Sequence, residues 1–354
     1  MSSRQVFFLY AFAVPAFKVA MLPSFLAHEA GQDMWLTIGV AMLIDVILLC
    51  LIMFIKTRVG VLGYGSVASK VISRCIAVVL AIYFLLQAVV GFEEVVAYLL
   101  QSFFDEAERL QIIVPLIVAI AYLSYKGAGA IGRMAEVMVW VLLLNVLVSV
   151  AFNNAQIDYS NLLPVMDNDV SVLFSAHKNA LWFGDYLPLL FIDVRDRQKR
   201  RYGYIFGGAV AILAVVVFIN ATFYSQWGEL TSSVPNAFQR LSGYNFISSD
   251  VGKIDWLNIL TWITSCVMKL SLLLLGTKGA INHLLNRDVS KIIAPVSAGI
   301  VGLAIIFFIK DVKTAYIFGT GLWVVGVIVT VIPVVVLALL ALIDNRRGKV
   351  GKNI

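Results

Sequence analysis

The sequence predicts an all-α integral membrane protein with about ten transmembrane helices. Of its 354 residues, 61% are hydrophobic and only 14% are charged, and the mean hydropathy is +0.92. A soluble domain does not need so much apolar surface. Most of the 27 Lys and Arg residues lie in every second gap between long apolar segments. Membrane proteins keep positive charge on the cytoplasmic side, so this alternation indicates a chain that crosses many times. It also explains the net charge of +6 without a nucleic-acid partner, and we expect none.

The predicted spans form one transmembrane domain over residues 1–354. A span needs about 20 apolar residues, which gives the segments 5–28, 34–55, 75–102, 111–125, 133–153, 170–192, 203–227, 255–282, 291–309 and 314–343. The fourth is short for a span, and Pro333 should kink the tenth. The long outer loop 228–254 is expected to hold a short helix near Pro235.

The charges of the loops predict the orientation. Basic residues precede the first span and follow every even-numbered one, which places both termini in the cytoplasm. The opposite loops are mostly acidic, with Glu29, Asp33, Asp105, Glu106, Glu108, Asp158, Asp167 and Asp169.

Two predicted spans are interrupted at mid-depth. In the first span two prolines bracket Lys18. In the sixth span Gly184 and Pro188 bracket Asp185. Proline removes a backbone donor, and freed backbone groups are tolerated in a membrane only beside protein or water. The first and sixth of ten spans are corresponding members of two halves, about 5–153 and about 170–343. Such a pair favours a binding site in an inverted-repeat transporter over two ordinary kinks.

Charged side chains within the spans are the first candidates for function, because each costs about 2.5–3.5 kcal/mol to insert. There are three lysines and five carboxylates: Lys18, Lys178, Lys269, Asp45, Glu93, Glu94, Glu136 and Asp185. Two carboxylates therefore have no lysine and should be protonated, near an interface, or beside another cation or water. We expect Lys18 and Asp185 to face each other or share a cavity. A buried ion pair that only fixes packing is the alternative.

Polar side chains at helical spacing form two stripes. One runs along the third span (Tyr83, Gln87, Gly91, Glu94 and Tyr98) and one along the eighth (Asn258, Trp262, Ser265, Lys269 and Gly276). Each could line a cavity or hold helices together. The stripes and the broken spans give the predicted substrate-binding set: Pro15, Ala16, Phe17, Lys18, Gly91, Glu94, Phe183, Gly184, Asp185, Ser265 and Lys269.

The sequence motifs that resemble those of enzymes do not indicate an enzyme here. Residues 127–132 match a dinucleotide-binding fingerprint, but they follow a membrane span, so we interpret them as a connector. No nucleophile–base arrangement is visible, and His28, His177 and His283 lack metal-ligand spacing. We expect no catalysis, cofactor or metal, and no disulfide from the three cysteines.

Short motifs along nearly the whole chain resemble the B-subunit family of spore germination receptors. They are Ser2-Ser3-Arg4-Gln5, Leu22-Pro23-Ser24, Ala30-Gly31-Gln32-Asp33 with Trp35, Asn161-Leu162-Leu163-Pro164, Phe183-Gly184-Asp185, Ile254-Asp255 and Lys269-Leu270-Ser271. That family belongs to the wider amino acid–polyamine–organocation transporters. The resemblance implies a LeuT-type 5+5 inverted repeat with helices one and six broken.

The resemblance further implies a multi-pass subunit in the inner membrane of a bacterial spore. It would bind a small germinant, often an amino acid, and work with a membrane-anchored A subunit and a lipoprotein C subunit. Members commonly carry Glu at the position of Asp185, and many place Gly where this chain has Ala16. Lys18 would then supply the cation for a ligand carboxylate or stand in for a coupling ion. The alternatives are a proton-coupled amino acid or amine permease and an ion-conducting pore.

Overall fold

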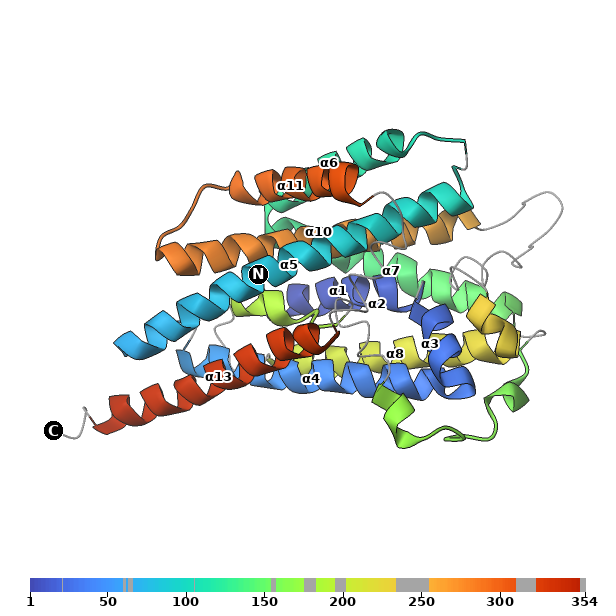
Figure 1. The fold of residues 1–354 in the computed structure, drawn as a ribbon, viewed down its shortest axis with the longest axis horizontal. Helices are drawn as coiled ribbons and strands as arrows, with labels where there is room; N and C mark the ends of the chain where they lie inside the picture. The colour runs from blue at the N-terminus through green and yellow to red at the C-terminus, as the bar shows by residue number, and fades with distance from the viewer. Residues whose placement is uncertain are drawn as a thin grey trace.

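The computed structural model describes residues 1–20, 22–59, 62, 66–104, 106–153, 157–174, 183–194, 202–233, 255–309 and 323–350. Regular structure in these ranges is helical throughout, without a strand. Figure 1 shows the long helices running side by side along one axis as a bundle. Six segments are long and apolar enough to cross a membrane: Leu22–Val59, Val67–Gln101, Arg109–Lys126, Ala128–Asn145, Gly203–Ser233 and Ile259–Leu285. The prediction of an all-α, multi-pass membrane protein is confirmed at this level.

The α-helices are α1 (Ser3–Ala13), α2 (Pro15–Lys18), α3 (Leu22–Ala30), α4 (Met34–Val59), α5 (Val67–Ser102), α6 (Arg109–Lys126), α7 (Ala128–Asn153), α8 (Tyr202–Trp227), α10 (Asp255–Leu285), α11 (Ile293–Phe308) and α13 (Trp323–Val350). Short 3-10 helices are η1 (Gly31–Asp33), η3 (Tyr159–Leu162), η5 (Leu187–Leu190) and η7 (Gly228–Ser233). Most helices begin or end within a few residues of the predicted spans. There are two exceptions. α5 starts eight residues before the predicted start at residue 75, and α13 ends at Val350, beyond the predicted end at residue 343. The predicted helix near Pro235 and the start of the tenth span lie outside the described residues.

The first predicted span is divided into three pieces. Ser2 and Gln5 form a reciprocal capping box that starts α1. α1 ends at Ala13, and the four-residue α2 begins at Pro15, which has no N–H to continue the backbone ladder. α3 begins at Leu22. The segment around Lys18 is therefore a short turn of helix between two interruptions.

The described parts of the sixth predicted span, 170–174 and 183–192, contain no α-helix. The first part is 3-10 helical, and the second contains the four-residue η5. Gly184 has φ +79°, in the left-handed region that a side chain disfavours, and its position turns the chain just before Asp185. Residues 175–182 of this span, with Lys178, lie outside the described residues.

The helices around the broken segment form the interior of the bundle. α10 packs along α5 and is buried over most of its length, whereas α6 and α7 expose most of theirs. α1 packs against α7 on one side and α8 on the other, and α4 packs against α8. This arrangement surrounds α2 with α8 and α10, and brings α4 against η5.

One buried carboxylate holds an extended connection at the end of the bundle near η1. Asp33 is fully buried and accepts hydrogen bonds from the N–H groups of Met166 (2.8 Å) and Asn168 (3.2 Å). The side-chain amide of Asn168 adds bonds to Asp33 and to the Ala30 carbonyl. Gln32 donates to the Pro164 carbonyl at 2.7 Å. Two sequence motifs 130 positions apart thus meet here, and they fix the connection to the bundle.

Candidate binding site

Four buried charged side chains meet where the two interrupted segments approach each other. Lys18 contacts Asp185, and its Nζ lies 3.2 Å from Asp45 Oδ2. Lys269 Nζ lies 2.7 Å from the other oxygen of Asp185. All four side chains are 5% exposed or less. We call Lys18, Asp45, Asp185 and Lys269 the charge cluster; its two positive and two negative groups balance formally.

The cluster draws on four separate parts of the chain. Lys18 comes from α2, Asp45 from α4, Lys269 from α10, and Asp185 from the turn before η5. Isolated charges would be costly at this depth, and mutual pairing compensates much of that cost. The predicted contact between Lys18 and Asp185 is confirmed. Asp45 is one of the expected intramembrane charges and lies outside the predicted binding set, although it is the one charged residue of the apolar segment 34–55.

Asp45 also holds the backbone that carries Asp185. Its Oδ1 accepts the N–H of Gly184 at 2.8 Å, while Oδ2 faces Lys18. A Cβ added to Gly184 would approach Leu187 Cδ1 to 3.0 Å and Thr330 Cγ2 to 3.1 Å. Both the positive φ and the close packing therefore require glycine at this turn.

The carbonyl of Phe183, on the other side of that turn, accepts two side-chain donors from α5. Tyr83 Oη donates at 2.9 Å and Gln87 Nε2 at 3.2 Å. These residues belong to the predicted polar stripe of the third span. Here two side chains of the stripe bind a carbonyl of the irregular backbone. They replace hydrogen bonds that a regular helix would make within its own backbone.

The interrupted α1–α2 segment is held in the same way. Ser265 on α10 donates to the Phe12 carbonyl, and Trp262 Nε1 donates to the Ala16 carbonyl at 2.6 Å. Asn220 on α8 donates to the Lys18 carbonyl at 3.3 Å. Side chains from two neighbouring helices thus satisfy carbonyls at the interruption. Ser265, predicted to bind substrate, here binds the backbone of α1. The contact of Asn220 with the Lys18 carbonyl could not be predicted from the sequence.

Aromatic rings cover both ammonium groups. Lys18 Nζ lies 4.9 Å from the centre of the Phe183 ring, and Lys269 Nζ lies 4.8 Å from that of Phe17. A cation over the face of an aromatic ring is stabilised by its quadrupole. Gly91 makes room for Phe17: a Cβ there would lie 3.1 Å from the ring.

The remaining predicted residues lie on α2 and α5. Pro15 and Ala16 are buried in α2, and Pro15 also lines an apolar cavity bounded by α1, α7 and α8. Glu94 is 4% exposed and lies on α5 between Gly91, which contacts Leu270, and Tyr98, whose ring stacks on Trp262 with centroids 4.2 Å apart. Glu94 therefore faces α10, as predicted.

Arginines from the ends of helices partner two of the other carboxylates. Arg109 at the start of α6 pairs with the buried Glu93 and also donates to the Ile309 carbonyl at 2.9 Å. Arg4 Nε lies 3.5 Å from Glu136 Oε1. The expectation that carboxylates without a lysine lie beside another cation is confirmed for Glu93 and Glu136, although the sequence does not indicate which cations they meet.

A neutral, buried group of two ammonium and two carboxylate groups can bind a ligand that carries both charges, or it can exchange protons. Within the described ranges, no group of three or more His, Cys, Asp or Glu side chains could hold a metal ion.

Comparison with known proteins places these residues in a recognised family. The family model Spore_permease, described as spore germination protein, matches residues 1–314. The match includes all four members of the charge cluster and both interrupted segments. No curated protein matches the chain.

Proposed function

The chain belongs to the Spore_permease family of spore germination proteins, and from that premise we propose that it is the germinant-sensing membrane subunit of a spore germination receptor. The germinant is a small amino acid or a similar nutrient bound at the charge cluster. The proposal includes a LeuT-type 5+5 inverted repeat of about ten helices, with both termini in the cytoplasm. It also includes A- and C-type receptor subunits as partners in the inner spore membrane.

The observation that carries the proposal is the equal charge composition of the cluster. A zwitterionic amino acid offers one carboxylate and one ammonium group, and the cluster contains complementary groups of both signs. Asp185 contacts both lysines, so a ligand ammonium could replace one of them while the displaced lysine binds the ligand carboxylate. This exchange keeps every buried charge paired.

The interrupted backbone supports a sensing role. The α1–α2 segment and the turn at Gly184 are held largely by side chains of α5, α8 and α10, rather than by a continuous helical ladder. A ligand that rearranges the cluster would therefore act on both segments. It shifts the equilibrium between two arrangements only if it binds one of them more tightly.

The test is Asp185→Asn, with Asp167→Asn at an exposed outer position as the matched control. We expect Asp185→Asn to abolish the response of spores to the germinant while the protein still accumulates, and the control to respond normally. In parallel, purified protein is screened against amino acids for an increase in apparent melting temperature, which a ligand of the native state produces. A normal response in Asp185→Asn spores would rule out the assignment.

A proton-coupled amino acid or amine permease is the second candidate, favoured by the buried carboxylates Asp45 and Asp185 beside lysines. Proteoliposomes with an imposed pH gradient distinguish the two. Accumulation of a labelled amino acid supports transport, and ligand binding without flux across a broad panel supports sensing alone.

A further inference from the structure

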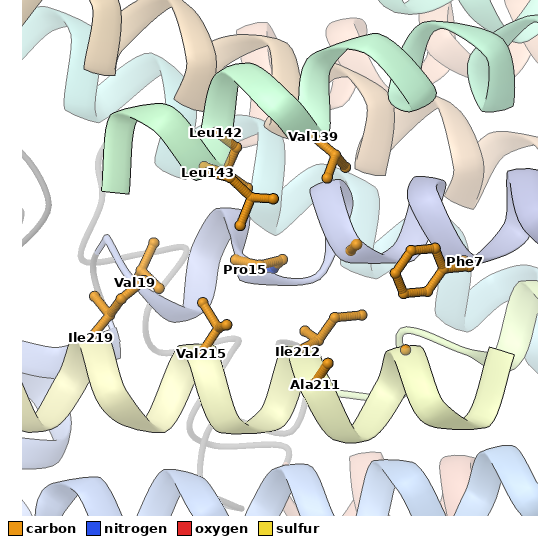
Figure 2. A pocket seen from close by; sticks show the side chains of 12 residues that line it. Phe7, Pro15, Val19, Val139, Leu142, Leu143, Ala211, Ile212, Val215 and Ile219 are labelled. Atoms are coloured by element: carbon orange, nitrogen blue, oxygen red, sulfur yellow. The ribbon is translucent and has the colours of Figure 1, made fainter. Parts of the chain in front are cut away.

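A wholly apolar cavity lies against the broken segment, bounded by α1, α7 and α8. Its volume is about 220 Å³, and all twelve lining residues are apolar. Pro15 and Val19 of the interrupted segment form part of its floor, with Phe7 and Ala11 of α1 (Figure 2). A cavity with no polar partner stays free of ordered water and accepts apolar guests, so it cannot hold the amino acid proposed above.

The walls of the cavity are α7 and α8. Leu142 and Leu143 contribute from α7, and Ala211, Val215 and other residues contribute from α8 (Figure 2). Within the described residues both helices pack extensively on α1 and make little contact with each other. The cavity therefore opens between them, where Ala211 is exposed and Leu143 is 39% exposed.

The surfaces on both sides of this opening are typical of contact with lipid. On α7, Trp140, Leu144 and Leu147 are 63%, 58% and 68% exposed. On α8, Val210 and Phe218 are 46% and 47% exposed. Large apolar side chains exposed in a row on membrane helices face the hydrocarbon, so the cavity is continuous with the bilayer interior.

The length of the cavity corresponds to one leaflet. Along α8 it runs from Gly208 to Ile219, a rise of roughly 16 Å in a helix. This is about half of a hydrocarbon core of about 30 Å.

Cationic side chains mark one end of the cavity. Arg4 lies one turn before Phe7 on the same face of α1, and its side chain is 74% exposed. Arg133, also exposed, lies two turns before Trp140 on the lipid-facing side of α7. Arg4 also lies 3.5 Å from Glu136, but the two arginines outnumber this carboxylate, so this end complements an anionic lipid headgroup.

We propose that this cavity binds one acyl chain of an anionic phospholipid, with the headgroup at Arg4 and Arg133 and the chain against Pro15 and Val19. The lipid contacts the same short segment that carries Lys18, through Pro15 and Val19. It thereby supports the interrupted helix from the bilayer, independently of any ligand at the charge cluster.

Photolabelling of the full chain tests the proposal. The protein is placed in phosphatidylcholine nanodiscs that contain a small fraction of phosphatidylglycerol with a diazirine in its acyl chain, and labelled residues are mapped by mass spectrometry. We expect label at Leu142, Leu143 and Val215 in excess of the label at the outward-facing Leu339 of α13, which is 54% exposed. Equal labelling of cavity and outer faces would overturn the proposal.

Two kinds of variant separate the contribution of the acyl chain from that of the headgroup. Ala211→Phe, with Val215→Phe as a second filling variant, should abolish cavity labelling and leave Leu339 labelled, while Val118→Phe on the exposed face of α6 should change nothing. Unchanged cavity labelling in both filling variants would refute the acyl site. Arg4→Gln should lower labelling by the phosphatidylglycerol probe to that of a matched phosphatidylcholine probe. Equal labelling by the two probes in the unmodified protein would refute the headgroup assignment.

Discussion

Asp45 accepts a hydrogen bond from the backbone N–H of Gly184 at 2.8 Å, across 139 positions of sequence. A carboxylate of α4 thus holds the turn that presents Asp185, while its second oxygen faces Lys18. The bond to the backbone and the ion pair come from different oxygens of the same side chain, so their contributions can be separated by substitution.

Asp45→Asn keeps an oxygen for the Gly184 N–H but removes the negative charge beside Lys18. Asp45→Leu removes both and leaves a buried donor unsatisfied, which costs about 1–3 kcal/mol. We expect both variants to lower the apparent melting temperature of the purified protein, and Asp45→Leu to lower it more. Equal shifts would show that the bond to Gly184 contributes little. Asp167→Asn, at an exposed position, is the control and should melt like the unmodified chain.

Gly184→Ala tests the turn itself. The new methyl group would occupy a position with φ +79° and lie 3.0 Å from Leu187 Cδ1. The backbone conformation alone costs an L-residue roughly 1–2 kcal/mol. We expect a clear loss of thermal stability and weaker ligand binding, because the turn positions Asp185. The matched control is Gly203→Ala, where an added Cβ meets nothing within 4 Å in the described structure. A loss of equal size at Gly203 would contradict this account.

Much of the fold follows from the sequence because membrane spans have a strong compositional signal, and the contact between Lys18 and Asp185 followed because both lie in interrupted spans. The role of Asp45 could not be predicted in this way. A single carboxylate in an apolar helix does not reveal which lysine it meets until α4 and η5 are packed together. Arg109 lies outside the predicted span 111–125, so it is not among the charges expected within the spans. α6 begins at that residue, two positions before the predicted span, and this brings its guanidinium to Glu93.

Substitution of Lys56 tests which contacts stabilise the second half of the broken sixth span. Its buried ammonium donates to the carbonyls of Leu189 at 2.8 Å and Ile192 at 2.5 Å, at the end of η5. Cations stabilise the carbonyl end of a helical turn. Lys56→Met should destabilise the protein by about 1–3 kcal/mol, as expected for unpaired buried carbonyls, and Lys56→Arg should recover part of that loss.

The control for this prediction is Lys70→Met, which removes the same charge from an exposed position of α5. Thermal unfolding in detergent compares the three variants with the parent. If Lys56→Met and Lys70→Met behaved alike, the loss would reflect charge in general and not the two carbonyl contacts.

The last prediction concerns Asp33, which joins η1 to the connection that contains η3. Asp33→Ala removes the acceptor for Met166 and for both donors of Asn168, and each buried donor left unpaired favours local opening. Hydrogen exchange of residues 165–174 should therefore become faster, while exchange in α10 stays unchanged. Asp167→Ala, at an exposed neighbour, should leave both unaffected. Unaltered exchange at 165–174 in Asp33→Ala would mean that Gln32 and Asn161, through their bonds to Pro164 and Ser225, are sufficient to hold the connection.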